Sequence, residues 1–338
     1  MTRILLVAAL VLSALSSPPA RAWNRKEATR FATLPPGTGH PEGITVDDYG
    51  NVYVADFDVS KSSGPGQVVV FDHSGRLLRV LNVEGSSNLL LGLDFHRVGR
   101  SLELLVIDFG GQKVLRVDPR SGASTIFTTI PGGANAGPNA LTFDKLGNVY
   151  ISDSFQGVIW QTGPGGGAIT SWAASPLLGT AGVPPFGANG IAFNRAQTAM
   201  YVANTGNDTV VKIDAGTRAA SVFVNSINGA DGLVVDEDDN IWVCANQEDE
   251  IVVIEPVNGR AIAKLGDFDG LSHDGAPVGL LFPASLVLHG GFLYVTNLSL
   301  DLRLFNPAFN AVDSVWAASV RKHTVARIPR HLPPVRGD

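Results

Sequence analysis

Residues 138–153 read PNALTFDKLGNVYISD, and they decide the fold. Two short runs of alternating apolar and polar residues flank the pair Gly147-Asn148, a pattern that predicts a β-hairpin with a tight turn. Related stretches begin at Pro41, Leu91, Ala188, Ala230 and Pro283. The chain is therefore built from six copies of one hairpin-containing unit.

The spacing of the copies predicts the architecture. The residues just before the six inner strands are Glu42, Leu91, Asn139, Asn189, Asp231 and Ala284, at intervals of 49, 48, 50, 42 and 53 residues. Six units of this length, each with several short strands, are typical of an all-β fold, the six-bladed β-propeller with four-stranded blades. An α-solenoid is excluded because no unit shows helical periodicity.

The two ends of the chain are expected to close the ring. The sixth copy supplies two inner strands and residues 323–328 a third, but no later segment supplies a fourth. Residues 28–34 form a strand without a blade, so we expect them to pair with the strand around Val325 and to remove the exposed sheet edges. Residues 299–320 are an insertion in the last blade, with a short helix around 311–320.

The bulk composition is that of a folded globular protein. The 338 residues are 45% hydrophobic and 17% charged, with 38 Gly and 20 Pro, which favours many short strands and turns. The net charge of −6 and the absence of a basic cluster argue against a nucleic-acid partner.

Residues 1–22 resemble a secretory signal peptide, which leaves residues 23–338 as a single propeller domain. Arg3 precedes an apolar run, and Ala20-Arg21-Ala22 has the form of a cleavage site. The run is too short to span a bilayer as a stable helix, although a retained anchor is the alternative. We expect a secreted or periplasmic protein without a membrane partner after cleavage. Cys244, the single cysteine, is expected to be a buried structural thiol.

The aligned positions also predict a site. In a propeller they form a ring at one mouth of the channel, and four of the six are oxygen donors: Glu42, Asn139, Asn189 and Asp231. Two carboxylates and two amides would balance a divalent cation, and a set of hard oxygen ligands suits Ca²⁺, with Mg²⁺ or Mn²⁺ as alternatives. The simpler interpretation is that these side chains hydrogen-bond neighbouring backbone.

A second polar residue ends the second strand of each copy. The six are Asp56, Asp108, Asp153, Asn204, Asn246 and Asn297. A residue of this kind in every blade indicates a turn or capping device. Asp153 and Asn204 are the best candidates for a ligand contact, because their blades also supply ring residues.

The ring order Glu, Asn, Asn, Asp on blades one, three, four and five resembles the calcium-dependent propeller hydrolases of the gluconolactonase/regucalcin (LRE-like) family, related to paraoxonases. Pro41-Glu42-Gly43, Pro138-Asn139, Ala188-Asn189-Gly190 and Asp231-Gly232 match its motifs. The resemblance implies hydrolysis of a small lactone or ester. Asp231 would act as base or nucleophile, and Glu42 would mainly hold the ion.

Two histidines are further catalytic candidates. His40 lies two residues before Glu42, and His273 lies in a polar loop that leads into the sixth copy. The hairpins also resemble NHL repeats, so a non-enzymatic propeller that binds a protein, peptide or glycan is the alternative function. A third possibility is a metal-free synthase or lyase resembling strictosidine synthases, against which the complete ring counts.

Overall fold

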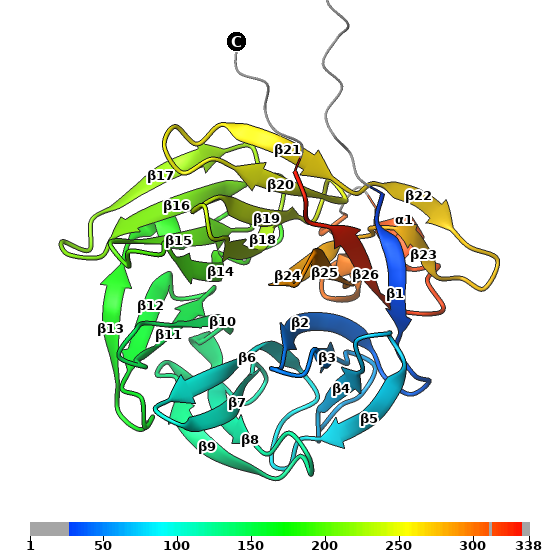
Figure 1. Cartoon of the computed structure of the whole chain (residues 1–338), viewed down its shortest axis with the longest axis horizontal. Coiled ribbons are helices and arrows are strands. Elements are labelled where there is room, and N and C mark those ends of the chain that lie inside the picture. Colours follow the sequence, from blue (N-terminus) through cyan, green and yellow to red (C-terminus); the bar gives the residue numbers. More distant parts are fainter. Residues whose placement is uncertain (1–26, 311–312, 333–338) are drawn as a thin grey trace, which may run out of the picture.

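Six four-stranded antiparallel sheets are arranged around a central channel (Figure 1). The structure is a computed structural model that describes residues 27–310 and 313–332. The fold is the six-bladed β-propeller that the repeat predicts. The predicted signal peptide, residues 1–22, lies outside the described residues. No helix in the described ranges is long and apolar enough to cross a membrane.

Each blade runs from an inner strand to an outer strand in chain order. Blade I contains β2 (His40–Val46), β3 (Val52–Phe57), β4 (Gln67–Phe71) and β5 (Leu77–Asn82). Blade II contains β6 (Leu90–Val98), β7 (Ser101–Asp108), β8 (Lys113–Val117) and β9 (Ser124–Thr129). Blade III contains β10 (Pro138–Phe143), β11 (Val149–Asp153), β12 (Val158–Thr162) and β13 (Ile169–Ala174). Blade IV contains β14 (Ala188–Phe193), β15 (Ala199–Asn204), β16 (Thr209–Asp214) and β17 (Ala220–Asn225). Blade V contains β18 (Ala230–Val235), β19 (Ile241–Ala245), β20 (Glu250–Ile254) and β21 (Ala261–Leu265).

Blade VI joins the two ends of the chain. It contains β24 (Pro283–His289), β25 (Phe292–Asn297) and β26 (Thr324–Pro329), and its outer strand is β1 (Thr29–Thr33). Ala32 pairs with Val325, and Thr29 pairs with Arg327. The predicted closure of the ring is confirmed.

The inner strands approach one another closely along the channel. A Cβ atom on Gly43 would lie 2.3 Å from the carbonyl oxygen of Leu91 in the next blade, and one on Gly232 would lie 2.5 Å from that of Ala284. Real Cβ atoms do not come this close to backbone, so only glycine fits. The glycine that follows several ring residues therefore has a packing role.

Apolar side chains fill the space between neighbouring blades. One cluster joins Tyr53 and Val68 of blade I to Leu93 and Leu104 of blade II. Cys244 is fully buried between blades V and VI, as the sequence predicts for a structural thiol. The core thus fixes the angle between blades and holds the inner strands in place.

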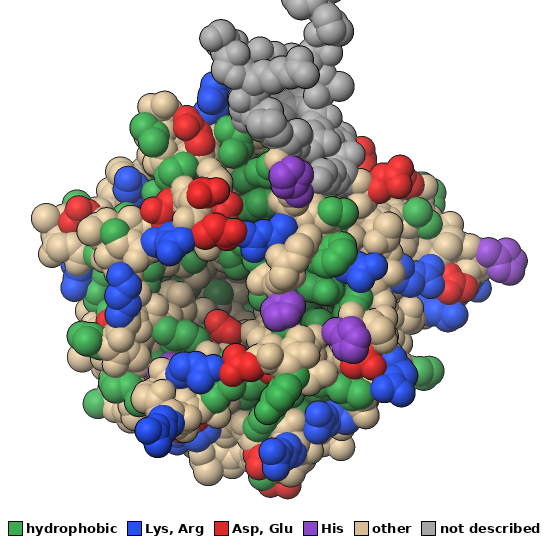
Figure 2. All heavy atoms as spheres, viewed as in Figure 1, with side chains coloured by type: hydrophobic (Ala, Val, Ile, Leu, Met, Phe, Trp, Pro, Cys, Tyr) green, Lys and Arg blue, Asp and Glu red, His purple; other side chains and the backbone are tan. Residues whose placement is uncertain are grey.

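Additional elements surround blade VI and the mouths of the channel. The hairpin of β22 (Phe268–Leu271) and β23 (Pro277–Gly279) precedes the blade, and the insertion carries η3 (Leu302–Leu304) and the short helix α1 (Ser314–Ala317). Two further 3₁₀ turns are η1 (Gly133–Asn135) and η2 (Pro176–Leu178). One face of the molecule is hollowed at its centre (Figure 2), and Thr45, Asp94 and Arg195 line the hollow at the end of the channel away from the ring.

Candidate functional site

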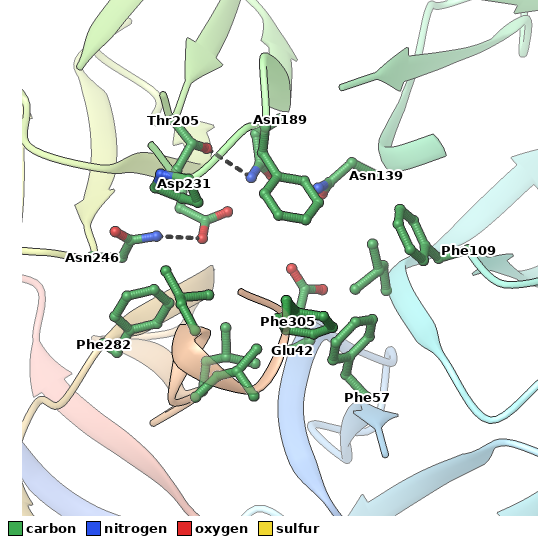
Figure 3. A pocket seen from close by; sticks show the side chains of 16 residues that line it. Glu42, Phe57, Phe109, Asn139, Asn189, Thr205, Asp231, Asn246, Phe282 and Phe305 are labelled. Carbon is green, nitrogen blue, oxygen red and sulfur yellow. Dashed lines mark hydrogen bonds between the residues drawn. The ribbon is translucent and has the colours of Figure 1, made fainter. Parts of the chain in front are cut away.

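The four ring residues meet in one pocket at a mouth of the channel. Glu42, Asn139, Asn189 and Asp231 all line it, and each is 5% exposed. Their side chains point toward a common centre (Figure 3). The pocket is partly open to solvent at the mouth of the channel.

A repeated irregularity of the inner strands presents these side chains. The pairing of β2 with β3 shifts register between Pro41 and Ile44, and the pairing of β18 with β19 shifts between Ala230 and Leu233. Equivalent shifts flank Asn139 and Asn189. A bulge re-aims a side chain out of the normal alternation, so the ring residues turn into the pocket while the rest of each strand stays in the sheet.

Burial raises the pKa values of the two carboxyl groups, and the charge of Asp231 raises that of Glu42 further. The pKa of Asp231 rises to about 7, mainly because the group is buried, while a hydrogen bond from Asn246 opposes the rise. The pKa of Glu42 is also raised well above its ordinary value, by burial and then by the charge of Asp231. Two buried carboxylates that repel each other require a proton or a cation between them.

Neighbouring polar groups orient the ring residues. Asn189 Nδ2 donates to Thr205 Oγ1 at 2.9 Å, and that hydroxyl donates to the carbonyl oxygen of Ala230 at 2.8 Å. Thr296 Oγ1 donates to the carbonyl oxygen of Glu42 at 2.6 Å. Asn246 Nδ2 donates to Asp231 Oδ2 at 2.9 Å. The bonds from Thr205 to Ala230 and from Thr296 to Glu42 cross from one blade to the next, so the ring geometry depends on the assembled propeller.

The donor atoms fit a hard divalent cation. Oε2 of Glu42 and Oδ1 of Asp231 are buried and have no hydrogen-bond partner among the described residues. Buried carboxylate oxygens are normally paired or ligated, and two charges with amide oxygens beside them match the ligand preference of Ca²⁺. The described residues contain no cluster of three or more His, Cys, Asp or Glu side chains suited to a metal, so the amides are needed to complete such a site.

Most of the second polar set acts as capping groups. Asp153 Oδ1 accepts from the backbone nitrogens of Gly137 and Gln156, and Asn204 Nδ2 donates to the carbonyl oxygens of Leu177 and Gly179. Neither lines the pocket, so the sequence-based choice of these two as ligand contacts is not supported. Asn246, at the equivalent position in blade V, lines the pocket instead. Asn246 differs from Asp153 and Asn204 because the ring residue of its own blade, Asp231, lies within hydrogen-bond distance of its amide.

The two candidate histidines lie in different places. His273 is an exposed residue between β22 and β23. The polar loop that carries it forms a hairpin outside the ring, so His273 is not one of the described residues that line the pocket. His40 lies below the pocket wall, where Nδ1 is 2.9 Å from the carbonyl oxygen of Leu298 and the ring packs edge-on against His323 at 4.4 Å. Burial lowers the pKa of both His40 and His323. His40 is thus placed to support the loop that carries Leu298.

Apolar residues form the remaining wall of the pocket. The sequence indicates Leu91, one of the six aligned positions, and the mouth loop 183–187, a candidate for substrate recognition, but it does not indicate most of the others. Those that the lining includes are Phe57, Leu91, Phe109, Pro184, Phe186, Phe282, Leu298, Leu300, Leu302 and Phe305. A sequence signal existed for two of them, because Phe57 and Phe109 directly follow Asp56 and Asp108 at the ends of their second strands. Leu91 lies in β6 at an aligned position, whereas the remaining residues lie in loops and in the blade VI insertion, where no repeat predicts their position.

Comparison with known proteins gives a family-level match and several structural neighbours. Residues 99–266 match the model of the SMP-30/Gluconolactonase/LRE-like region. The chain is similar to regucalcin, a calcium-binding protein from Agrobacterium tumefaciens, with a TM-score of 0.64 and 17% identity over 93% of this chain and 99% of that one. It is also similar to a luciferin-regenerating enzyme, with a TM-score of 0.62 and 17% identity over 87% and 92%.

A neighbour of a different activity shows how far this likeness reaches. Virginiamycin B lyase from Staphylococcus aureus aligns with a TM-score of 0.55 and 16% identity, over 80% of this chain and 82% of that one. At such identities the shared property is the fold. A search of curated proteins finds no significant match.

Proposed function

Because the chain belongs to the SMP-30/gluconolactonase/LRE-like family, we propose that it is a Ca²⁺-dependent hydrolase of lactones or related esters. The observation that carries the proposal is the pair of buried carboxylates, Glu42 and Asp231, each with an unpartnered oxygen inside one pocket. Asn139 and Asn189 would complete the ligand set. A bound Ca²⁺ would polarise the carbonyl group of the substrate.

The chain's own residues have separable roles in this proposal. Asp231 is the proposed base: Asn246 fixes Oδ2, and the carboxylate, beside the cation, would take a proton from the attacking water. Burial raises the pKa of Asp231 and so its basicity, whereas a bound Ca²⁺ would lower the pKa and keep the group ionised near neutral pH. Glu42 holds the cation, with its backbone fixed by Thr296. Export, which the pattern of residues 1–22 supports, would expose the site to extracellular calcium.

The test is hydrolysis of a panel of small lactones by the wild-type protein and the Asp231→Asn variant, in Ca²⁺ and in a chelator. We expect wild-type turnover that disappears with chelator and returns with Ca²⁺. The variant should lose at least about a hundredfold in kcat, because its amide cannot accept a proton from water. Full activity in the variant, or turnover unaffected by chelator, would contradict the proposal. Calcium binding measured by calorimetry separates loss of the metal from loss of the base.

A further inference from the structure

The pocket is divided into a polar half and an apolar half. Asn139, Asn189, Thr205, Asp231 and Asn246 come from blades III, IV and V. The opposite side, built by blades VI, I and II and by the blade VI insertion, is apolar apart from Glu42 (Figure 3). Any substrate whose reacting carbonyl lies at the ring must therefore place the rest of its atoms against the apolar half.

Phenylalanine rings form a continuous arc along this apolar half. Phe305 of the insertion lies 6.5 Å from Phe57 at the end of β3, measured between ring centroids. Phe57 lies 6.1 Å from Phe109, and Phe109 lies 6.4 Å from Phe186. The arc thus runs from the insertion across blades I and II to the loop before blade IV. Contacting rings at these distances support one another and present a stable apolar surface.

Polar groups are scarce beyond the ring. Among the described residues that line the pocket there is no Lys, Arg or His, and Glu42 and Asp231 are its only charged side chains. A substrate carboxylate or phosphate would therefore find no positive side chain. The hydroxyl groups of a sugar lactone would lose water at the apolar wall and gain few hydrogen bonds there, which costs free energy.

We infer that the substrate of this site is an uncharged lactone or ester with an extended apolar substituent, and that the phenylalanine arc selects it. This inference rests on the proposed hydrolase function for its chemistry, but the apolar specificity itself can be measured by binding. The reacting carbonyl lies at the ring, and the alkyl or aryl substituent lies along Phe57 and Phe109. A polyhydroxylated sugar lactone is excluded as the preferred substrate.

The rim of the pocket allows a long substituent. Phe155, which packs against Phe186 at 5.4 Å, is 45% exposed, and Phe305 is 50% exposed. The apolar surface therefore continues from the buried wall to the outside of the mouth. A substituent of several methylene groups can follow this surface and still leave water access at the ring.

The experiment measures kcat/KM for δ-lactones whose alkyl substituent grows from methyl to heptyl, with glucono-δ-lactone as the polar comparison. Burial of each methylene group should raise kcat/KM about three- to fourfold until the substituent reaches solvent at the rim. Glucono-δ-lactone should be the poorest substrate. Hydrolysis of every lactone with no dependence on chain length, or preference for the sugar lactone, overturns the inference and leaves the hydrolase function intact.

A binding measurement separates this inference from the hydrolase function. Alkyl δ-lactams, which resist hydrolysis, are titrated against the protein loaded with the neutral apolar dye N-phenyl-1-naphthylamine. Displacement that strengthens with chain length, in a protein that hydrolyses no lactone, supports the apolar specificity while the hydrolase proposal fails. Displacement without dependence on chain length overturns the specificity.

A pair of variants locates the effect. Phe305→Ser removes a half-exposed ring of the arc and should lower kcat/KM, or lactam affinity, about fivefold for the heptyl compound and less than twofold for the methyl compound. Tyr49→Ser removes an 87% exposed ring in the β2–β3 turn and should change neither. Equal effects of Phe305→Ser on both compounds would assign the ring a merely structural role and overturn the inference.

Discussion

Asn246 donates a hydrogen bond from Nδ2 to Oδ2 of Asp231 at 2.9 Å, and both residues are buried in the pocket. This bond occupies one oxygen of the carboxylate and leaves the other, Oδ1, facing the centre of the ring. A hydrogen bond to a carboxylate stabilises its charged form and lowers its pKa. Asn246 therefore opposes the effect of burial on Asp231, and it sets which oxygen is available for chemistry.

Replacement of Asn246 by Ala should shift the pH dependence of activity. Without the hydrogen bond the pKa of Asp231 rises above its value of about 7, so a smaller fraction is ionised at neutral pH. We expect the acid limb of the profile of kcat/KM against pH to move up by about one unit, with a loss of up to about tenfold on the acid side of the profile. Lactone hydrolysis measured from pH 5 to 9 gives the shift directly.

Asn204→Ala is the matched control for that experiment. Asn204 has the same position at the end of the second strand in blade IV, but its amide donates to backbone carbonyl oxygens of Leu177 and Gly179. Its loss should lower stability without moving the pH profile. Equal shifts in the two variants would mean that general loosening of the mouth, and not the bond to Asp231, controls the base.

Thr205→Val should weaken cation binding as well as the fold. The hydroxyl group accepts from Asn189 and donates to the carbonyl oxygen of Ala230, so the variant leaves two buried polar groups unpaired. We expect the free energy of unfolding to fall by about 1–3 kcal/mol. Because Asn189 would lose its orientation, the affinity for Ca²⁺ should fall about tenfold, as is common when a second-sphere partner is removed. Calorimetric titration with Ca²⁺ measures it.

Ser154→Ala separates these two effects. Ser154 Oγ donates to the carbonyl oxygen of Ala188 at 2.7 Å, and so it joins blades III and IV as Thr205 joins blades IV and V. Within the described residues, its hydroxyl group makes no hydrogen bond to a ring side chain. The variant should lose a similar stability and keep its Ca²⁺ affinity. A parallel loss of affinity in both variants would argue that blade contacts in general, and not the orientation of Asn189, hold the cation.

Gly43→Ala should destabilise the ring at the channel. The new Cβ would lie 2.3 Å from the carbonyl oxygen of Leu91, so β2 and β6 must separate, at a cost of about 1–3 kcal/mol or more. Gly163→Ala is the control, since a Cβ there meets nothing within 4 Å. Thermal unfolding of both variants should show a lower Tm only for the first. Similar Tm values would mean that the inner strands tolerate a wider spacing.

The repeat explains why the fold and the ring could be predicted from sequence. Period and alternation are properties of each unit, and symmetry places equivalent residues, such as Glu42 and Asp231, at equivalent distances from the axis. The closure of the ring could be predicted in the same way, because the strand of residues 28–34 has no blade of its own and the strand around Val325 needs a partner. Such inferences need only the local pattern and the topology that it implies.

The specific contacts of the site could not be predicted in this way. Asn246 and Asn204 are equivalent in the repeat, and only the residue beside each one makes their roles different. Phe305 lies in an insertion that the repeat does not describe, and its contact with Phe57 depends on how that insertion folds over the mouth. The position of His273 in the sequence, just before the sixth copy, suggests a residue near the ring, but the hairpin of β22 and β23 holds it outside the pocket.

A buried carboxyl group outside the ring should make stability depend on pH. Asp249 is 6% exposed and accepts a hydrogen bond from the backbone nitrogen of Phe282 at 2.7 Å, so it supports the pocket wall. Burial, followed by the charges of Asp313 and Asp267, raises its pKa to about 8. The unfolded chain releases this proton near pH 4 and the folded protein near pH 8, so stability falls as the pH rises between these values.

Asp249→Asn should remove this share of the pH dependence, because the amide oxygen can still accept from Phe282 and carries no charge. We expect the variant to gain stability over the wild type as the pH rises from 4 to 8.5, by a few kcal/mol at the upper end. Asp214→Asn should give the opposite trend: hydrogen bonds from Thr217 lower the pKa of Asp214, so its contribution is present above pH 4 and lost in acid. Urea unfolding of the three proteins from about pH 2 to 8.5, at constant Ca²⁺, tests both signs, because the contribution of Asp214 changes only in the acid part of this range. Parallel curves for Asp249→Asn and the wild type would show that Asp249 is already ionised in the folded protein across this range and would contradict the prediction.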